Sequence, residues 1–193
     1  PEAHLHPQYQ NTFFEYLNEL QSKGLQVFVT SHSPTITAKS DVNNISILQR
    51  KQSIIQSFSF DELSEDDYPK ESKRHLRKFL DTTKAQLFFA NGVLLVEGVA
   101  EAIIIPILAK KFLTEKIDLC KSGIELVNIG GVAFNHFGLL FNNDDERKRL
   151  LSKCAIITDS DPKDNGDISD RAQKAKDLEK HNLKVCLATH TLE

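Results

Sequence analysis

The sequence contains no methionine, no tryptophan and only three cysteines among its 193 residues. Cys120, Cys154 and Cys186 lie far apart and form no CxxC pair. This pattern argues against a zinc site or a disulfide framework and favours reduced thiols in a cytoplasmic protein. No apolar run approaches the roughly 18 residues of a membrane-spanning helix, so we expect no contact with a membrane. Because the chain begins at Pro1 and lacks methionine, we also expect it to be a fragment of a longer protein.

An excess of positive charge is lacking as well. The formal net charge is −3, the isoelectric point is about 6.2, and 40% of the residues are hydrophobic. This composition is typical of a globular protein. A protein that binds nucleic acid over a wide face is usually basic, so any such contact here must be local or assisted by a metal ion.

Strand and helix patterns alternate in the second half of the chain. The predicted strands are residues 93–97, 124–129, 154–159 and 185–189, and the predicted helices are residues 100–113, 132–141 and 172–181. Repeated strand–helix order with continuous apolar strands is typical of an α/β fold. We therefore predict a mostly parallel sheet covered by helices on both faces.

The first half of the chain is less regular. The spacing of apolar residues predicts a helix at residues 11–23 that ends before Gly24, and the run LQVFVT at residues 25–30 is typical of a buried strand. Further on, we expect a two-stranded unit at residues 44–50 and 53–60, a charged surface connection at residues 61–74, and a helix at residues 75–90.

Acidic residues follow two of the predicted parallel strands. Glu97 ends the first of them, and Asp159 ends another, with Asp161 two residues later. Extended alternation would place Asp159 and Asp161 on one side, and Glu101 would lie in the first turn of the next helix. The carboxyl ends of parallel strands meet at one edge, so we expect these carboxylates to converge there, with no lysine or arginine beside them. Such oxygen ligands suit Mg²⁺ or Mn²⁺.

These residues resemble a TOPRIM domain, the fold shared by topoisomerases, bacterial primases and several nucleases. The resemblance rests on Gly92-V-L-L-V-Glu97-Gly98-x-x-Glu101, on a later glycine turn, and on I-I-T-Asp159-x-Asp161. It implies that Glu97, Asp159 and Asp161 hold a metal ion and form the catalytic centre. Glu101 fits the nuclease branch, which is thought to use two metal ions.

The first residues resemble the last part of an ABC-type ATPase head. The run PEAHLHPQ at residues 1–8 is similar to the D-loop of that family, and VFVTSHSP at residues 27–34 is similar to the strand that ends in a histidine. The resemblance implies that His32 senses the γ-phosphate of ATP in the parent protein. The Gly-rich GxxxxGK[ST] loop is absent from this sequence, so we expect no ATP hydrolysis by this chain.

An ATPase head followed closely by a TOPRIM domain resembles the OLD (overcoming lysogenization defect) family of ATP-dependent nucleases, which includes the Gabija defence nuclease. The resemblance implies a metal-dependent DNA endonuclease, antiviral defence, and assembly into a dimer or larger oligomer, with a regulatory partner protein possible. It also implies that Thr191 and Glu193 join the metal site, although a lysine that the family carries further downstream is absent. We expect the ATPase piece at residues 1–60, a linking segment at residues 61–90, and the TOPRIM domain at residues 91–193.

Two other interpretations stay open at this point. The chain could be a non-catalytic piece that couples the ATP state to assembly or to a partner, or it could be a primase-like or topoisomerase-like TOPRIM protein. A basic cluster could add a phosphate contact, although a solvated helix face is the commoner explanation of such a pattern. The cluster consists of Lys70, Lys73, Arg74, Arg77 and Lys78.

Overall fold

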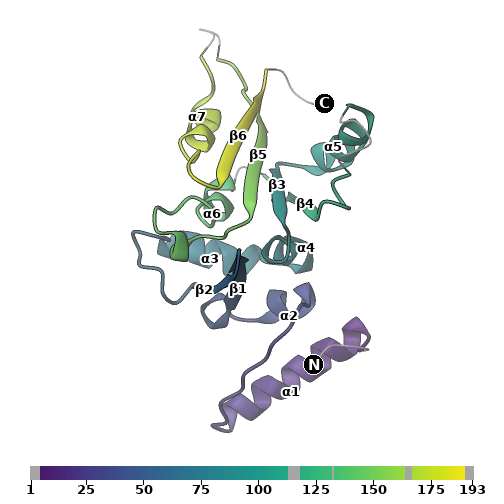
Figure 1. The fold of residues 1–193 in the computed structure, drawn as a ribbon, viewed down its shortest axis with the longest axis vertical. Coiled ribbons are helices and arrows are strands. Elements are labelled where there is room, and N and C mark those ends of the chain that lie inside the picture. Colours follow the sequence, from purple (N-terminus) through teal and green to yellow (C-terminus); the bar gives the residue numbers. More distant parts are fainter. Residues whose placement is uncertain (1–4, 113–117, 132, 164–166, 190–193) are drawn as a thin grey trace.

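The computed structural model describes residues 5–112, 118–131, 133–163 and 167–189. The chain is elongated, with α1 at one end and a parallel sheet at the other (Figure 1). The helices are α1 (Pro7–Ser22), α2 (Pro34–Lys39), α3 (Lys70–Phe79), α4 (Thr82–Ala85), α5 (Val99–Phe112), α6 (Phe134–Gly138) and α7 (Asp170–Lys176). The strands are β1 (Ser46–Lys51), β2 (Ile54–Ser59), β3 (Gly92–Val96), β4 (Ile124–Asn128), β5 (Lys153–Asp159) and β6 (Leu183–Ala188). Single 3₁₀ turns are η1 (Val42–Asn44), η2 (Gln86–Phe88) and η3 (Glu146–Lys148).

The second half of the chain forms a parallel sheet in the order β4-β3-β5-β6. The chain passes from β3 to β4 on one side and then places β5 on the other side of β3. The direction of winding therefore reverses between β3 and β5. In open α/β sheets, ligands bind beyond the carboxyl ends of the strands at such a switch point.

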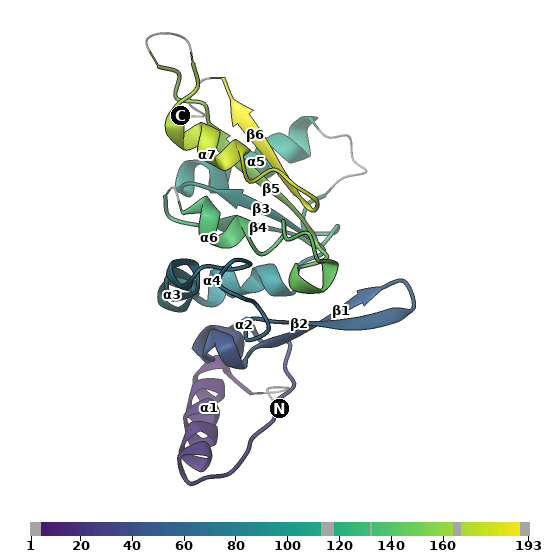
Figure 2. The same ribbon diagram turned by 90° about the vertical axis from the view of Figure 1, so that its left-hand side faces the viewer.

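Helices lie on both sides of this sheet, which confirms the predicted α/β architecture. α6 and α7 lie on one side and α5 on the other (Figures 1 and 2). Along β5, Cys154, Ile156 and Thr158 are buried, whereas the residues between them are only half-buried. The face with α6 and α7 is therefore the better covered one, and Phe137 of α6 is fully buried.

The first half contains α1, α2 and a hairpin of β1 and β2 that extends away from the rest (Figure 2). Gly24, with a φ of +86°, follows α1, as expected for a residue that ends a helix in the left-handed region. The strand predicted at residues 25–30 was wrong. No strand in the described part of the chain pairs with this segment, and 85% of Phe28 is exposed. An apolar run becomes a buried strand only where neighbouring strands accept its hydrogen bonds.

The predicted connection and helix between the two halves also need correction. α3 begins at Lys70 and ends at Phe79, because the Asp81 carboxylate accepts a hydrogen bond from the Lys84 backbone N–H (2.8 Å) and starts α4. The segment before α3 is not only a surface connection, since Leu63 and Tyr68 belong to the core.

One hydrophobic core runs from the hairpin to the sheet. Phe58 and Phe60 enter it from the hairpin, Leu76 from α3, and Leu95 and Ile156 from β3 and β5. This shared core fixes the linking segment against the base of the sheet. No helix among the described residues is long and apolar enough to cross a membrane.

Candidate metal centre

Glu97 and Asp159 lie at the carboxyl ends of the two strands that flank the switch point. Val96 pairs with Ile157 in the β3–β5 ladder, so Glu97 follows β3 beside Thr158. The Thr158 hydroxyl, itself buried, donates a short hydrogen bond to Glu97 Oε1. The ladder and this bond fix Glu97 at the edge of the sheet, as predicted.

Asp161 reaches the same edge by a different backbone path from the one expected. β5 ends at Asp159, and Asp161 has a φ of +40°, so the extended alternation does not continue through it. The Ser160 backbone N–H donates to the Ala188 carbonyl (2.9 Å), which holds the turn against the end of β6. Asp161 is brought near the other acids by this turn and not by strand periodicity.

Glu101 lies in the first turn of α5, as predicted, and is 8% exposed. Its Oε2 accepts a hydrogen bond from the Gly98 backbone N–H (3.1 Å). A Cβ at position 98 would also meet this oxygen at 3.1 Å, so glycine leaves room for the carboxylate to fold back. A second glycine turn supports the same corner, since the Gly131 backbone N–H donates to the Glu97 carbonyl (2.8 Å).

The expectation that no cation lies beside these acids was wrong. Arg171, from the first turn of α7, forms a short ion pair with Glu97 Oε2 through Nη2. Its Nη1 lies 3.4 Å from Asp161 Oδ2. One guanidinium therefore bridges two of the predicted metal ligands. The sequence analysis missed Arg171 because a single arginine in a helix that begins nine residues after Asp161 forms no recognisable motif with the acids.

Asp159 has the least favourable surroundings of the four acids. Burial raises the pKa of its carboxyl, and the charges of Glu97, Asp161 and Glu101 raise it further, while Arg171 opposes them. Its Oδ1 is buried and has no hydrogen-bond partner among the residues that the structure describes. A buried carboxylate oxygen without a partner is costly, so this atom is a candidate for binding a cation.

The four acids supply the type of oxygen ligand that a divalent metal ion prefers, but their side chains are not positioned as a complete set of ligands. Carboxylate oxygens suit Mg²⁺ or Mn²⁺, and the orphaned Asp159 oxygen is free to act as a ligand. In the described part of the chain, however, no three His, Cys, Asp or Glu side chains are grouped so that they could hold a metal. Arg171 occupies oxygens of Glu97 and Asp161 instead. The predicted ligands Thr191 and Glu193 lie outside the described residues.

His32, the predicted ATP sensor, lines a cavity to which none of the four acids contributes. It precedes α2 on the wall of this cavity of about 1350 Å³, which residues of α1, α2 and β1 also line. Beside it, the buried Ser33 hydroxyl donates to Gln10 Oε1 (2.8 Å) and caps α2. The role of His32 towards ATP stays a prediction.

The basic cluster on α3 is largely engaged by the protein itself. Lys70 pairs with Glu65 (2.5 Å), Lys73 donates to the Phe60 carbonyl (2.8 Å), and Arg77 pairs with Asp41 (3.1 Å). These contacts favour the interpretation of the cluster as a structural and solvated helix face.

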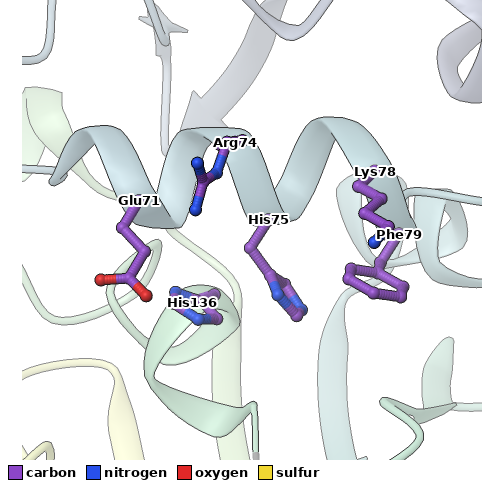
Figure 3. Close-up of a pocket in the computed structure, with 6 residues that line it drawn as sticks. All are labelled: Glu71, Arg74, His75, Lys78, Phe79 and His136. Carbon is purple, nitrogen blue, oxygen red and sulfur yellow. The ribbon is translucent and has the colours of Figure 1, made fainter.

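Arg74 and Lys78 line a pocket of about 330 Å³ between α3 and α6 (Figure 3). His75 stacks on His136 there, with ring centroids 4.2 Å apart, and burial lowers the pKa of both imidazoles. His136 Nδ1 lies 2.9 Å from the Ser72 hydroxyl. These contacts join α3 to α6, and none of the four acids lines the pocket.

Two family models match separate parts of the chain. The family model described as the overcoming lysogenization defect protein-like TOPRIM domain matches residues 88–161. The family model of the AAA ATPase domain matches residues 1–37. The first range contains all four acids of the described edge, and the second contains His32.

Two nucleases are among the similar proteins. The Old nuclease of Escherichia phage P2 is 28% identical over 159 residues, which cover 82% of this chain and 27% of that protein. Endonuclease GajA of Bacillus cereus (strain HuB5-5) is 27% identical over an alignment of 199 positions, which covers 92% of this chain and 28% of that protein. The chain thus spans little more than a quarter of either relative.

A solved structure is similar as well. The C-terminal region of the OLD protein of Xanthomonas campestris pv. campestris is 28% identical, with 56% of this chain and 54% of that chain covered and a TM-score of 0.39.

A parallel sheet with acids beyond the ends of its two central strands, together with the match over residues 88–161, defines a TOPRIM domain. The resemblance to the OLD family expected from the sequence is supported by both relatives. The chain joins a segment that matches an AAA ATPase domain to one that matches an OLD-like TOPRIM domain.

Proposed function

We propose that this chain carries the centre of a metal-dependent endonuclease that cuts or nicks DNA by phosphodiester hydrolysis. The observation that carries the proposal is the orphaned, buried oxygen of Asp159 at the switch point of the sheet, with Glu97 beside it on the neighbouring strand. The relationship to Old nuclease and to endonuclease GajA supports the same chemistry.

The positions of the four acids suggest which of two metal ions each would bind. Glu97, Asp159 and Asp161 would hold one ion between β3 and β5, and Glu101 would help to hold a second from the start of α5. Two divalent ions held there would supply the chemistry of hydrolysis, one by lowering the pKa of a bound water and the other by stabilising the leaving oxygen. Thr158 would keep Glu97 oriented through its hydroxyl, as ligand-supporting groups commonly do.

DNA would approach an acidic protein through these ions. The net charge of −3 provides no broad attraction for a polyanion, so the bound cations would bridge the carboxylates to the phosphates. In the parent protein, we propose that the ATPase part, with His32 near the γ-phosphate, controls this centre. We also propose that the parent protein assembles into a dimer or larger oligomer and acts in antiviral defence.

A non-catalytic role is the second candidate, and one observation favours it. The acids of the described residues are not grouped to hold a metal, and Arg171 neutralises two of them. A TOPRIM domain that only transmits an ATP-dependent change would need no cation at this edge.

Nicking of supercoiled plasmid by the full-length protein separates the two candidates. The assay compares Mg²⁺, Mn²⁺ and EDTA, and it includes Asp159→Ala and the control Asp170→Ala, an acid of α7 whose side chain is 87% exposed. We expect metal-dependent nicking that Asp159→Ala abolishes and Asp170→Ala preserves, with both variants folded by circular dichroism. Wild-type nicking by Asp159→Ala would reject this assignment, and no nicking by any folded form would favour the non-catalytic role.

A further inference from the structure

Arg171 connects the two halves of the acidic edge. Its Nη2 contacts Glu97, which follows β3, and its Nη1 contacts Asp161, which follows β5. A planar guanidinium can contact two carboxylates at once through separate nitrogens, which a lysine ammonium does less well. Arg171 therefore ties together acids that belong to different strands.

The position of Arg171 is built into the turn that carries the acids. The Ser169 backbone N–H donates to the Ser160 carbonyl (3.0 Å), and the Ser169 hydroxyl accepts from the Ala172 backbone N–H (3.1 Å) to cap α7. Ala172 is fully buried under this first turn. The start of α7 is thus fixed next to Asp159 and Asp161, and Arg171 extends from it over the edge.

A cation among the four acids reduces the repulsion between their negative charges. The carboxylates of Glu97, Asp161 and Glu101 lie near that of Asp159, and like charges gathered in this way repel one another. In the absence of another cation, Arg171 offsets part of this repulsion. It does so unevenly, because the orphaned Asp159 oxygen receives no hydrogen bond from it.

Arg171 and a metal ion would need the same atoms. The oxygens that Arg171 contacts belong to Glu97 and Asp161, two of the ligands in the proposed function, on which this step rests. An oxygen paired with a guanidinium is not available to a metal in the same geometry. Arg171 is 36% exposed, so its head can leave the acids towards solvent without disrupting the core.

We propose that Arg171 is the resident counter-ion of this carboxylate centre, holding Glu97 and Asp161 together without metal and competing with a divalent cation for them. It is a positioning residue that sets how tightly the metal binds. Asp159 remains open as the first point of contact for the incoming ion.

Thermal unfolding and Mn²⁺ titration of the full-length protein test this proposal. Arg171→Gln removes the charge, and Lys174→Gln is the matched control because it removes the same charge from an exposed position of α7. We expect Arg171→Gln to lower the melting temperature in EDTA by about 2–4 °C. In saturating Mn²⁺ it should melt like the native protein and bind Mn²⁺ about tenfold more tightly. Lys174→Gln should change neither property.

Each outcome separates this proposal from the proposed function. An equal loss of stability with and without Mn²⁺ would make Arg171 merely structural, and so would an unchanged affinity, while the nuclease proposal would stand. Mn²⁺ binding by Arg171→Gln but not by the native protein would support the competition. Absence of Mn²⁺ binding in both proteins would overturn this proposal and the metal-dependent function together.

Discussion

Asp67 and Asp159 are both half-buried acids, and their surroundings shift the pKa values of their carboxyls in opposite directions. Asp67 accepts hydrogen bonds from Lys148 Nζ (2.7 Å), the Ser64 hydroxyl (2.7 Å) and Asn143 Nδ2 (2.9 Å). Together these bonds hold the pKa of the Asp67 carboxyl well below its usual range, and the bond from Lys148 contributes most. Burial raises the pKa of the Asp159 carboxyl, and one of its oxygens is buried without a partner in the described part of the chain.

The difference separates a structural acid from a functional candidate. Lys148 and Asn143 lie between α6 and β5, so the Asp67 bonds fasten the linking segment onto the TOPRIM domain. Every bond that stabilises the Asp67 carboxylate comes from the protein. At Asp159 the protein supplies neighbouring negative charge instead, an arrangement that costs stability unless a cation is bound.

The largest expected effect is on DNA cleavage by the full-length protein. Asp159→Asn should lower the metal-dependent nicking rate at least about 100-fold, because losing a supporting group alone commonly costs 10–100-fold. Asp67→Asn should leave the rate per folded molecule unchanged. Initial rates measured in Mn²⁺ give both values, and similar losses in the two variants would remove the distinction between these acids.

Stability should change in opposite directions in the same two variants. Asp67→Asn should lower the free energy of unfolding by about 2 kcal/mol, since it weakens hydrogen bonds to a charged group. Asp159→Asn should raise it by up to about 1 kcal/mol in the absence of metal, because one repelling charge is removed. Urea unfolding in EDTA measures both changes, and a large destabilisation by Asp159→Asn would contradict this account.

The contribution of Asp67 should depend on pH. Its pKa in the folded state lies below the ordinary value of 3.8, so the unfolded state takes up the proton first as the pH falls. The stabilisation is therefore present above pH 3.8 and is lost as the pH drops further towards the folded pKa. The difference in unfolding free energy between the native protein and Asp67→Asn should be constant near neutral pH and shrink in acid. A difference that grows in acid would have the wrong sign.

The smallest effect is expected for one of the donors to Asp67. Ser64→Ala removes the hydroxyl that bonds to the carboxylate but keeps the Ser64 backbone N–H, which also donates to it (3.1 Å). The expected loss is about 0.5–1 kcal/mol in the free energy of unfolding. A loss as large as that of Asp67→Asn would show that the bonds around Asp67 are not shared among several donors.

The sequence predicted the sheet and the placement of its acids well. β3 and residues 154–157 of β5 are continuous apolar runs, and parallel strands bring their carboxyl ends to one edge whatever their order. The order itself, and hence the switch point between Glu97 and Asp159, depends on long-range pairing that no local pattern contains. The path to Asp161 was predicted for the wrong reason, because a left-handed turn replaces strand alternation there.

Two failures have the same physical origin. Residues 25–30 have a strand-like composition, but the formation of a strand depends on neighbours that the described residues do not provide. Arg171 is unremarkable in the sequence, and only the packing of α7 against β5 and β6 brings it to the acids. In both cases the deciding contact is tertiary, so a single sequence gives no periodic signal for it.

Direct measurement of Mn²⁺ binding by calorimetry tests the central claim, that the unsatisfied Asp159 carboxyl is kept for a cation. The full-length protein should bind Mn²⁺, Asp67→Asn should bind it equally well, and Asp159→Asn should lose at least about tenfold in affinity. Equal binding by all three proteins, or by none of them, would contradict the claim.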